Sequence, residues 1–240
     1  MKVHLITIFP EFFEGPFSCG IVSRAQNAGL LNVQIHDLRN WTSDRHRTVD
    51  DRPFGGDEGM VLKVEPIFAA LRDLDVASAR KVLMSAQGPL FDQAAARRLA
   101  GYDEIVLVCG RYEGVDERVA EHLMDEELSI GNFVLTGGEW AAGVVVDSVA
   151  RLLPGAVGNA ASTERESFTP DAAGRVGILD FPHYTRPASF KVDGDEWTVP
   201  EVLLNGHHGQ IAEWRRQAAL EKTRRNRPDL LAGRGTVSER

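Results

Sequence analysis

Three loops that contain glycine are the stretches of this sequence best suited to hold a ligand. They read "SAQG" (85–88), "CGRYEG" (109–114) and "SIGNFVLTGGE" (129–139), and each follows a segment expected to be a strand. The carboxyl ends of parallel strands meet at one edge of an open α/β sheet, where such sheets bind ligands. Glycines let a heterocycle such as adenine approach the backbone groups that read its edge. The loops therefore predict one backbone-lined pocket, although glycines that only make tight turns would give the same pattern.

The familiar phosphate-binding and catalytic motifs are absent from the sequence. It has no P-loop pattern, and "GRYEG" does not match the dinucleotide fingerprint. Zinc-type spacings of Cys and His and the G-x-S-x-G of hydrolases are missing too. His207 and His208 stand without further ligands, so we expect no protein-built metal site. The pocket therefore suits a ligand held by backbone contacts rather than by a phosphate-binding loop.

Composition is typical of a globular protein outside the membrane. The chain has 240 residues, of which 43% are hydrophobic and 26% charged. Its net charge of -8 argues against strong attraction of the whole protein to nucleic acid, but a local basic patch stays possible. Cys19 and Cys109 lie in apolar surroundings, which favours a reducing cytoplasm over a disulfide framework. The apolar run at the N-terminus is too short for a signal peptide or a membrane span, so we expect a cytoplasmic protein without membrane contact.

Strand-like and helix-like segments alternate along the first two thirds of the chain. Strands are expected at 3–9, 32–38, 80–86 and 104–109. Helices are expected at 17–29, 65–74, 92–100, 115–124 and 138–153, and Asp92 is a suitable N-cap for the third. This alternation predicts an α/β fold with a mostly parallel sheet covered on both faces.

A different kind of sequence follows Gly155. Residues 159–177 are rich in small and charged residues and are expected to form a flexible linker between a domain at 1–158 and another at 178–240. In the second domain, Ile211 and Trp214 fall on one face of a predicted helix. Basic residues surround that face, and they are Arg215, Arg216, Lys222, Arg224, Arg225 and Arg227. We expect a small, all-helical domain that carries the only strongly basic surface of the chain.

Five motifs, in order along the chain, closely resemble the bacterial tRNA (guanine-N1)-methyltransferase family. They are "HRTVDDRPFGGDEGM", "VCGRYEGVDERV", "SIGNFVLTGGE", "DSVARLLPG" and "PHYTRP". The resemblance implies an enzyme that transfers a methyl group from S-adenosylmethionine to N1 of the guanosine at tRNA position 37. It also implies the deep trefoil knot of the SPOUT class, which periodicity alone would never suggest. A homodimer with the active site at the subunit interface is implied as well, with magnesium as a possible aid.

The same resemblance assigns the residues of the cofactor pocket. Those implied to line it are Gly110 and the stretch Ile130, Gly131, Asn132, Phe133, Val134 and Leu135, with Ser85, Gln87, Gly88, Tyr112, Glu113, Gly114, Gly137 and Gly138 as neighbours. Asp180 is implied to reach the amino group of the cofactor from the partner subunit.

Methylation at N1 of guanine requires a base and a cation. N1 carries a proton at neutral pH, so a carboxylate must remove it, and an arginine can stabilise the charge that develops toward O6. Arg151 in "DSVARLLPG" matches the catalytic arginine of the family. Glu166 in "STERESF" stands where the family has the aspartate that acts as general base. Because the chain carries extra residues after Phe168, Asp171 is a second candidate.

Contacts to tRNA are expected in two regions. Those in the long polar loop and beyond the linker are Arg45, His46, Arg47, Arg52, Tyr184, Arg186, Arg215, Arg216, Arg224 and Arg225, with His183 as a further candidate. Two other functions fit less well. A knotted methyltransferase acting on another RNA, such as ribosomal RNA, is disfavoured by the match of the C-terminal region. A non-catalytic RNA-binding relative is disfavoured by the intact pocket loops.

Overall fold

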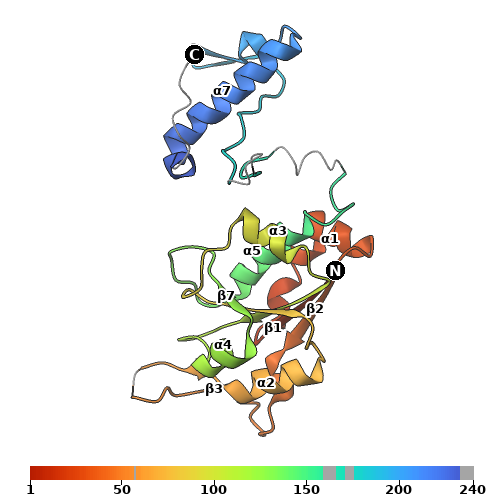
Figure 1. Cartoon of the computed structure of the whole chain (residues 1–240), viewed down its shortest axis with the longest axis vertical. Coiled ribbons are helices and arrows are strands. Elements are labelled where there is room, and N and C mark those ends of the chain that lie inside the picture. Colours follow the sequence, from red (N-terminus) through yellow and green to blue (C-terminus); the bar gives the residue numbers. More distant parts are fainter. Residues whose placement is uncertain (57, 159–165, 171–175, 233–240) are drawn as a thin grey trace. The chain divides into compact units, whose positions relative to one another are not determined.

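The computed structural model describes residues 1–56, 58–158, 166–170 and 176–232. The chain divides into two compact units, Met1–Ala160 and Ala161–Arg240 (Figure 1). Of the expected linker, residues 159–165 and 171–175 lie outside the described residues.

A parallel sheet forms the centre of the first unit. Over residues 1–56 and 58–158 it has five strands in the order β2-β1-β6-β5-β7, and every pairing is parallel. The strands are β1 (Lys2–Thr7), β2 (Asn32–Asp37), β5 (Arg80–Met84), β6 (Glu104–Cys109) and β7 (Glu126–Leu128). The expectation of a mostly parallel α/β sheet is confirmed. The strand expected at 3–9 ends at Thr7, because Pro10 begins a short 3-10 helix, η1 (Pro10–Phe13).

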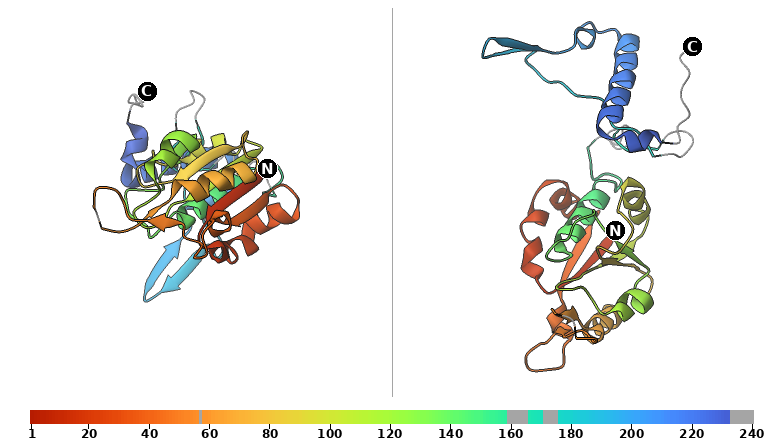
Figure 2. Two further views of the ribbon diagram at one scale, coloured as in Figure 1. Left: turned by 90° about the horizontal axis from the view of Figure 1, so that it is seen from below. Right: turned by 90° about the vertical axis from the view of Figure 1, so that its left-hand side faces the viewer.

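Helices cover both faces of this sheet (Figures 1 and 2). One face packs against α1 (Gly20–Asn27), α3 (Gln93–Leu99) and α5 (Glu139–Ala150), and the other against α2 (Val64–Asp73) and α4 (Glu117–Leu123). The buried strands alternate between the two cores, so that Ile105 and Leu107 of β6 join the first while Val106 and Val108 join the second. Asp92 caps α3 as expected, since its Oδ1 accepts a hydrogen bond from the Ala95 N–H at 2.8 Å.

The long polar loop holds more structure than expected. After η3 (Leu38–Trp41), two-residue strands β3 (Asp50–Asp51) and β4 (Val61–Leu62) pair antiparallel.

Near the N-terminus, a short 3-10 helix, η2 (Pro16–Ser18), takes the place of the first part of the helix expected at 17–29.

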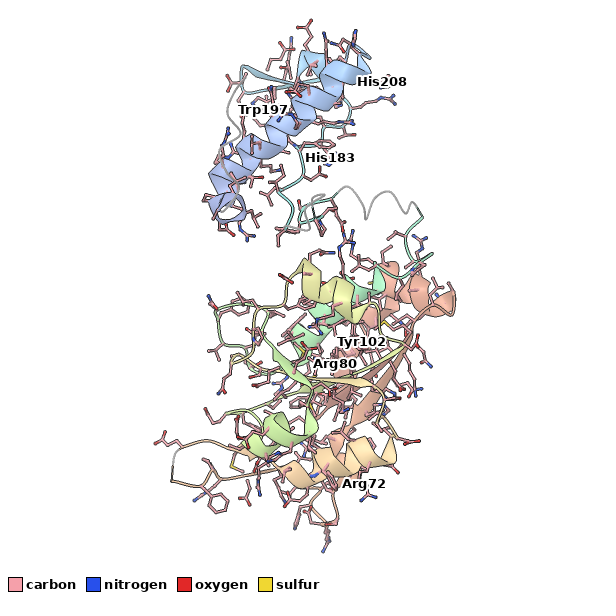
Figure 3. The ribbon with its side chains drawn as sticks, in the orientation of Figure 1. Arg72, Arg80, Tyr102, His183, Trp197 and His208 are labelled. Carbon is pink, nitrogen blue, oxygen red and sulfur yellow. The ribbon has the colours of Figure 1, made fainter. Side chains whose placement is uncertain are left out.

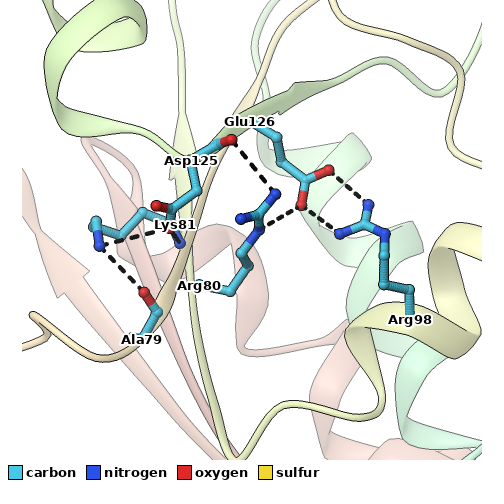
Figure 4. Close-up of polar contacts among 6 residues, drawn as sticks. All are labelled: Ala79, Arg80, Lys81, Arg98, Asp125 and Glu126. Atoms are coloured by element: carbon cyan, nitrogen blue, oxygen red, sulfur yellow. Dashed lines mark hydrogen bonds and ion pairs between the residues drawn. The ribbon is translucent and has the colours of Figure 1, made fainter.

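Charged side chains fix the short edge strand β7 to its neighbours (Figure 4). Glu126 accepts hydrogen bonds from Arg98 on α3 at 2.7 and 2.6 Å and from Arg80 on β5 at 2.9 Å. Burial pushes the pKa of Glu126 upward, but the two arginines outweigh it and leave the pKa below its ordinary value. The guanidinium carbon of Arg80 also lies 6.0 Å from the centroid of the Tyr102 ring (Figure 3). These contacts hold a strand of three residues in register.

Histidines occupy an unusual buried position near the other edge of the sheet. His4 is 1% exposed on β1, and its ring nitrogens lie 2.9 Å from His36 Nε2 and 3.1 Å from Glu104 Oε1. Burial, together with the charge of His4, lowers the pKa of His36 to about 4. Burial lowers the pKa of His4 as well, so both histidines are neutral near pH 7, and one hydrogen bond joins them.

The second unit is not all-helical, which corrects the sequence-based expectation. It contains an antiparallel hairpin of β8 (Ser189–Val192) and β9 (Asp195–Thr198), then η4 (Glu201–Leu203), α7 (His208–Asn226) and η5 (Pro228–Leu231). The hairpin turns at Asp193 and Gly194, which have φ values of 48° and 93°. A two-residue turn of this kind needs positive φ at both positions, for which Asp-Gly is well suited.

Candidate functional site

The loops that follow β5, β6 and β7 meet at the carboxyl edge of the sheet and enclose a cavity of about 240 Å³. Backbone contacts tie them together. The Gly138 N–H donates to the Gly110 carbonyl at 2.8 Å, and the Ser85 N–H donates to the Leu128 carbonyl at 3.0 Å. Arg111 also pairs with Gly137 in an antiparallel bridge. The three glycine loops therefore form one site, as their positions after successive strands suggested.

Nearly all the residues assigned to the cofactor pocket lie at this cavity. Those that line it are Ser85, Gln87, Gly110, Tyr112, Glu113, Gly114, Ile130, Gly131, Phe133, Val134, Leu135, Gly137 and Gly138. Gly88 and Asn132 are not among the lining residues. Tyr112 is 50% exposed and adopts a φ of 61°, a left-handed conformation that is uncommon for a residue with a side chain.

The glycines of these loops serve two different purposes. A Cβ at Gly138 would lie 2.9 Å from Cys109 Cα, and one at Gly88 would lie 2.6 Å from the Glu127 carbonyl carbon. Glycine is required there because neighbouring backbone leaves no room. At Gly110 the nearest atoms to such a Cβ are the Met84 carbonyl oxygen at 3.6 Å and Val115 Cγ1 at 3.7 Å, which is ordinary contact. Gly110 therefore lines the cavity at a position with room for a Cβ.

A buried ion pair that the sequence reasoning missed fixes two of the loops. Glu139 is the first residue of α5 and is 1% exposed. Its Oε2 accepts from Arg111 Nε at 2.9 Å, and its Oε1 accepts from the Thr7 hydroxyl at 2.8 Å. Arg111 also donates to the Thr136 carbonyl at 3.1 Å. The only sign of Glu139 in the sequence was its place after Gly137 and Gly138, because an acidic residue is favourable at the positive N-terminal end of a helix.

The charges around the cavity favour a cationic ligand. Glu113, Glu117 and Glu127 line it, and Arg111 is the only basic side chain among the described lining residues. The charge of Arg111 is already compensated by Glu139. A ligand with a phosphate would meet carboxylates here, whereas a ligand with a positive centre would be stabilised. Burial and the nearby charge of Glu139 raise the pKa of the Cys109 thiol, so this cysteine stays protonated and acts as a packing residue.

The two expected catalytic residues lie apart from this cavity or outside its unit. Arg151 follows the last residue of α5, whereas Gly138 precedes the first, so roughly 20 Å of helix separates them. Arg151 is not among the residues that line the cavity. Glu166 belongs to the second unit, where its N–H donates to Thr169 Oγ1 at 3.3 Å. Asp171 lies outside the described residues.

Residues next to Glu166 are hydrogen-bonded to the segment that precedes "PHYTRP". The Phe168 N–H donates to the Ile178 carbonyl at 3.2 Å, and the Asp180 N–H donates to Ser167 Oγ at 2.9 Å. Asp180 Oδ2 in turn lies 3.0 Å from His183 Nε2. Glu166 and Asp180 are therefore held on one local scaffold.

The basic residues expected to contact RNA differ in their surroundings. Arg45, His46 and Arg52 are exposed in the polar loop, while Arg47 is held by Asp37, Asn40 and the Arg39 carbonyl. On α7, Arg216 is bound by Glu213 at 3.0 and 2.6 Å. Arg215 lies 4.7 Å from the Phe181 ring. Tyr184, Arg186, Arg224 and Arg225 are exposed. Arg47 and Arg216 therefore have structural partners within the chain.

Two features are absent from the described residues. Across 1–56, 58–158, 166–170 and 176–232, no group of three or more His, Cys, Asp or Glu side chains could hold a metal ion. No helix in the described parts of the chain is long and apolar enough to cross a membrane. Magnesium as an aid to the reaction stays a prediction.

The fold and the site define a class of protein, an α/β protein with an acidic, backbone-lined ligand pocket at the carboxyl edge of a parallel sheet. Residues 1–233 match the family described as tRNA (guanine-1)-methyltransferase TrmD. A tRNA (guanine-N(1)-)-methyltransferase of Koribacter versatilis is 55% identical, over 97% of this chain and 93% of that protein. The enzyme so named from Gloeobacter violaceus is 51% identical, over 96% of this chain and 98% of that protein. The one from Geobacter metallireducens is 49% identical, over 96% of this chain and 91% of that protein. The chain belongs to the tRNA (guanine-N1)-methyltransferase family.

The buried ion pair gives a first testable prediction. In Glu139→Gln the Arg111 guanidinium loses its buried counter-charge, so the free energy of unfolding should fall by about 3 kcal/mol, the lower end for breaking such a pair. Chemical denaturation measures this, with the exposed Glu14→Gln as control, which should stay within about 0.5 kcal/mol of wild type. Equal stabilities of the two variants would mean that the pair does not anchor the loops.

Proposed function

We propose that this chain transfers a methyl group from S-adenosylmethionine to N1 of the guanosine at position 37 of tRNA. The observation that carries the proposal is the combination of the family match over residues 1–233 with the acidic cavity of the first unit. The same family membership supports action in the cytoplasm, where tRNA is modified.

The cavity fits this cofactor on three grounds. Its walls present backbone groups of three loops that can read the edge of an adenine. The open space at Gly110 leaves room for a ring close to the backbone. The carboxylates of Glu113, Glu117 and Glu127 favour a positive charge. When bound, S-adenosylmethionine supplies an electrophilic methyl group on a positively charged sulfur.

We further propose that the loops of the first unit form a trefoil knot. After the edge strand β7, the chain pairs with the loop that follows β6, through the bridge between Arg111 and Gly137, and then enters α5, which packs against β1 and β6. Contact of a late segment with the loop of an earlier strand is compatible with a knot, and the family match is what supports the proposal.

A homodimer is proposed because the first unit exposes apolar side chains that monomers rarely leave in water. Phe133 is 55% exposed, Val134 89% and Trp140 59%. Trp140 also carries an edge-to-face contact with Phe12, with ring centroids 4.7 Å apart. An exposed group of this kind marks an interaction surface. A second copy would cover it and would bring that copy's Arg151 and Asp180 to the cavity.

In the proposed reaction the residues of the chain move one proton and stabilise one charge. Glu166 accepts the proton from N1 of guanine, because N1 is a poor nucleophile while it is protonated. The Arg151 guanidinium stabilises the negative charge that then develops toward O6. The family carries aspartate at the position of Glu166. Glutamate has the same carboxylate at the end of one more methylene, and its backbone is held in a turn, since its carbonyl accepts from the Thr169 N–H at 3.2 Å.

The proposed function predicts a specific pattern of methyl transfer. With labelled S-adenosylmethionine, the purified chain should methylate an unmodified tRNA transcript that carries guanosine at position 37. It should leave the same transcript already methylated at N1 unlabelled, because the acceptor atom is blocked. Ribosomal RNA should stay unlabelled as well. Label in ribosomal RNA but not in tRNA would favour a different RNA substrate, and no label in any RNA would favour a non-catalytic protein.

Gly110→Val tests the placement of the cofactor. Gly110 lines the cavity and a Cβ there meets only ordinary contacts, so a valine should take up space beside the ligand and weaken binding of S-adenosylmethionine by about 10-fold or more, as overpacking of about 1–3 kcal/mol would give. Calorimetry measures the affinity, and the melting temperature of the variant should stay near that of wild type. Gly110→Ala, which adds only the Cβ, should have a smaller effect. Unchanged affinity in Gly110→Val would move the cofactor elsewhere.

Glu166 is tested by comparing three variants in single-turnover methyl transfer at saturating substrates. Glu166→Gln keeps the size of the side chain but accepts no proton at neutral pH, so turnover should fall about 10²-fold or more. Cofactor and tRNA affinities should change little. Glu166→Asp should keep substantial activity, and Asp171→Asn should stay within a few-fold of wild type. Near-normal turnover in Glu166→Gln with a collapse in Asp171→Asn would assign the base to Asp171.

A further inference from the structure

A cluster of ionisable side chains joins the edge strand β2 to its neighbour β1, and the proposed reaction does not use it. In the described sheet β2 is the strand at one edge and is paired with β1 alone (Figure 1). The cluster consists of His4 on β1, His36 on β2 and Glu104 on β6, with Lys2 of β1 at its border. A histidine pair across the pairing of an edge strand makes that pairing sensitive to protons.

The hydrogen bonds of the cluster fix where its protons lie. Glu104 is a carboxylate, since hydrogen bonds from His4 and Lys2 hold its pKa below the ordinary value. It accepts from the His4 Nε2–H at 3.1 Å, so His4 Nδ1 carries a lone pair. His4 Nδ1 in turn accepts from the His36 Nε2–H at 2.9 Å. Each ring therefore holds one proton, and the contact between the rings needs one nitrogen without a hydrogen.

The pair can accept one added proton without losing a contact, but not two. With one more proton, His4 still donates to Glu104, and its Nδ1–H donates to His36 once that ring changes tautomer. A second proton places a hydrogen on both nitrogens of the 2.9 Å contact, so two positive rings face each other. Burial, together with the charge of His4, accordingly lowers the pKa of His36 to about 4.

The charges on the neighbouring elements do not relieve this repulsion. From β1, the Lys2 ammonium lies 3.1 Å from Glu104 Oε1, and its positive charge lowers the pKa of both histidines. From η3, the Trp41 ring lies against the His36 ring with centroids 6.0 Å apart. Trp41 Nε1 donates to the Asp73 carboxylate of α2 at 3.0 Å, so that carboxylate is already engaged. Glu104 is the carboxylate in direct contact with the pair.

The strand that His36 holds also carries the long polar loop. Asp37, the last residue of β2, accepts from the Arg39 N–H at 2.9 Å and from Arg47 Nη2 at 3.4 Å. Arg47 Nε also donates to the Arg39 carbonyl at 3.2 Å. Separation of β2 from β1 would therefore release the start of the loop that holds the exposed basic residues of the first unit.

We propose that the contact between His4 and His36 is an acid-sensitive latch, in which two added protons detach β2 and the polar loop from β1 while the rest of the sheet stays paired. The latch is independent of the proposed methyl transfer, because it concerns how the first unit holds an edge strand. Detachment returns His36 to water, where its pKa has the ordinary value of 6.5. The detached state then binds more protons than the closed one between pH 6.5 and about 4. The closed latch is therefore fully favoured above pH 6.5 and is lost as the pH falls toward about 4.

His36→Gln separates the proton from the hydrogen bond. Its amide N–H can still donate to His4 Nδ1, but it takes up no proton between pH 7 and pH 4. In the wild type, the hydrogen-exchange protection of residues 32–37 should fall by about 10-fold or more from about pH 7 to about pH 4.5, corrected for intrinsic exchange rates. Protection of β5 and β6 should hold. In His36→Gln the loss over 32–37 should be less than about 3-fold. His122→Gln is the matched control, since this side chain is 69% exposed, and it should behave like the wild type.

Ring titration of the wild-type protein by NMR tests the latch without any variant. Of the seven histidines, His36 should titrate near pH 4 and His4 below 6.5. Glu104→Gln keeps an acceptor for His4 but removes the negative charge that stabilises the first proton. Protection of 32–37 should then be lost at a higher pH than in the wild type, which decides the matter if His36→Gln is unfolded. Ordinary titration of both histidines near 6.5, or equal acid losses of protection in wild type and His36→Gln, would overturn the proposal. So would simultaneous loss over β2, β5 and β6, because the whole unit would then be unfolding.

Discussion

The ion pair between Arg111 and Glu139 holds together the part of the molecule on which the site depends. Arg111 belongs to the loop after β6, and Glu139 begins α5 after the long loop that follows β7. With Thr7 of β1 on the other carboxylate oxygen, the pair joins three segments that are far apart in the sequence. Burying such charges costs free energy, which a fully hydrogen-bonded pair offsets. The close approach at Gly138 depends on the same geometry, because the loops must lie against each other without side chains between them.

The two units differ in their local charge. The cavity of the first unit is lined by three glutamates beside a compensated arginine, whereas that of the second is lined by two arginines and a histidine. The net charge of -8 is a sum over the whole chain and does not give the local charge of either cavity. An acidic surface repels phosphates and favours a cation, so the two regions suit ligands of opposite charge.

Periodicity was enough to predict the alternating elements, the parallel sheet and the cap at Asp92, because each rests on local sequence. It could not predict the order β2-β1-β6-β5-β7, since hydrophobic spacing shows that a segment is a strand but not which strand lies beside it. Glu139 was missed because glutamate is usually exposed, and its burial depends on Arg111 from another loop. The hairpin at 189–198 was missed although Asp193-Gly194 is a strong turn signal. The arginine-rich segment that follows has the spacing of a helix, which favoured an all-helical prediction for the whole region.

The helix α5 supports an active site shared between two copies. Its N-terminal end borders the cavity, and Arg151 follows its C-terminal end. A helix is a stiff rod, so roughly 20 Å of it cannot fold back to bring Arg151 to the cavity of the same unit. In the proposed dimer, Arg151 would instead serve the cavity of a second copy. Phe133, Val134 and Trp140, around the loops and the start of α5, expose apolar surface that such a contact would cover. The length of this helix thus ties the proposed role of Arg151 to the proposed dimer.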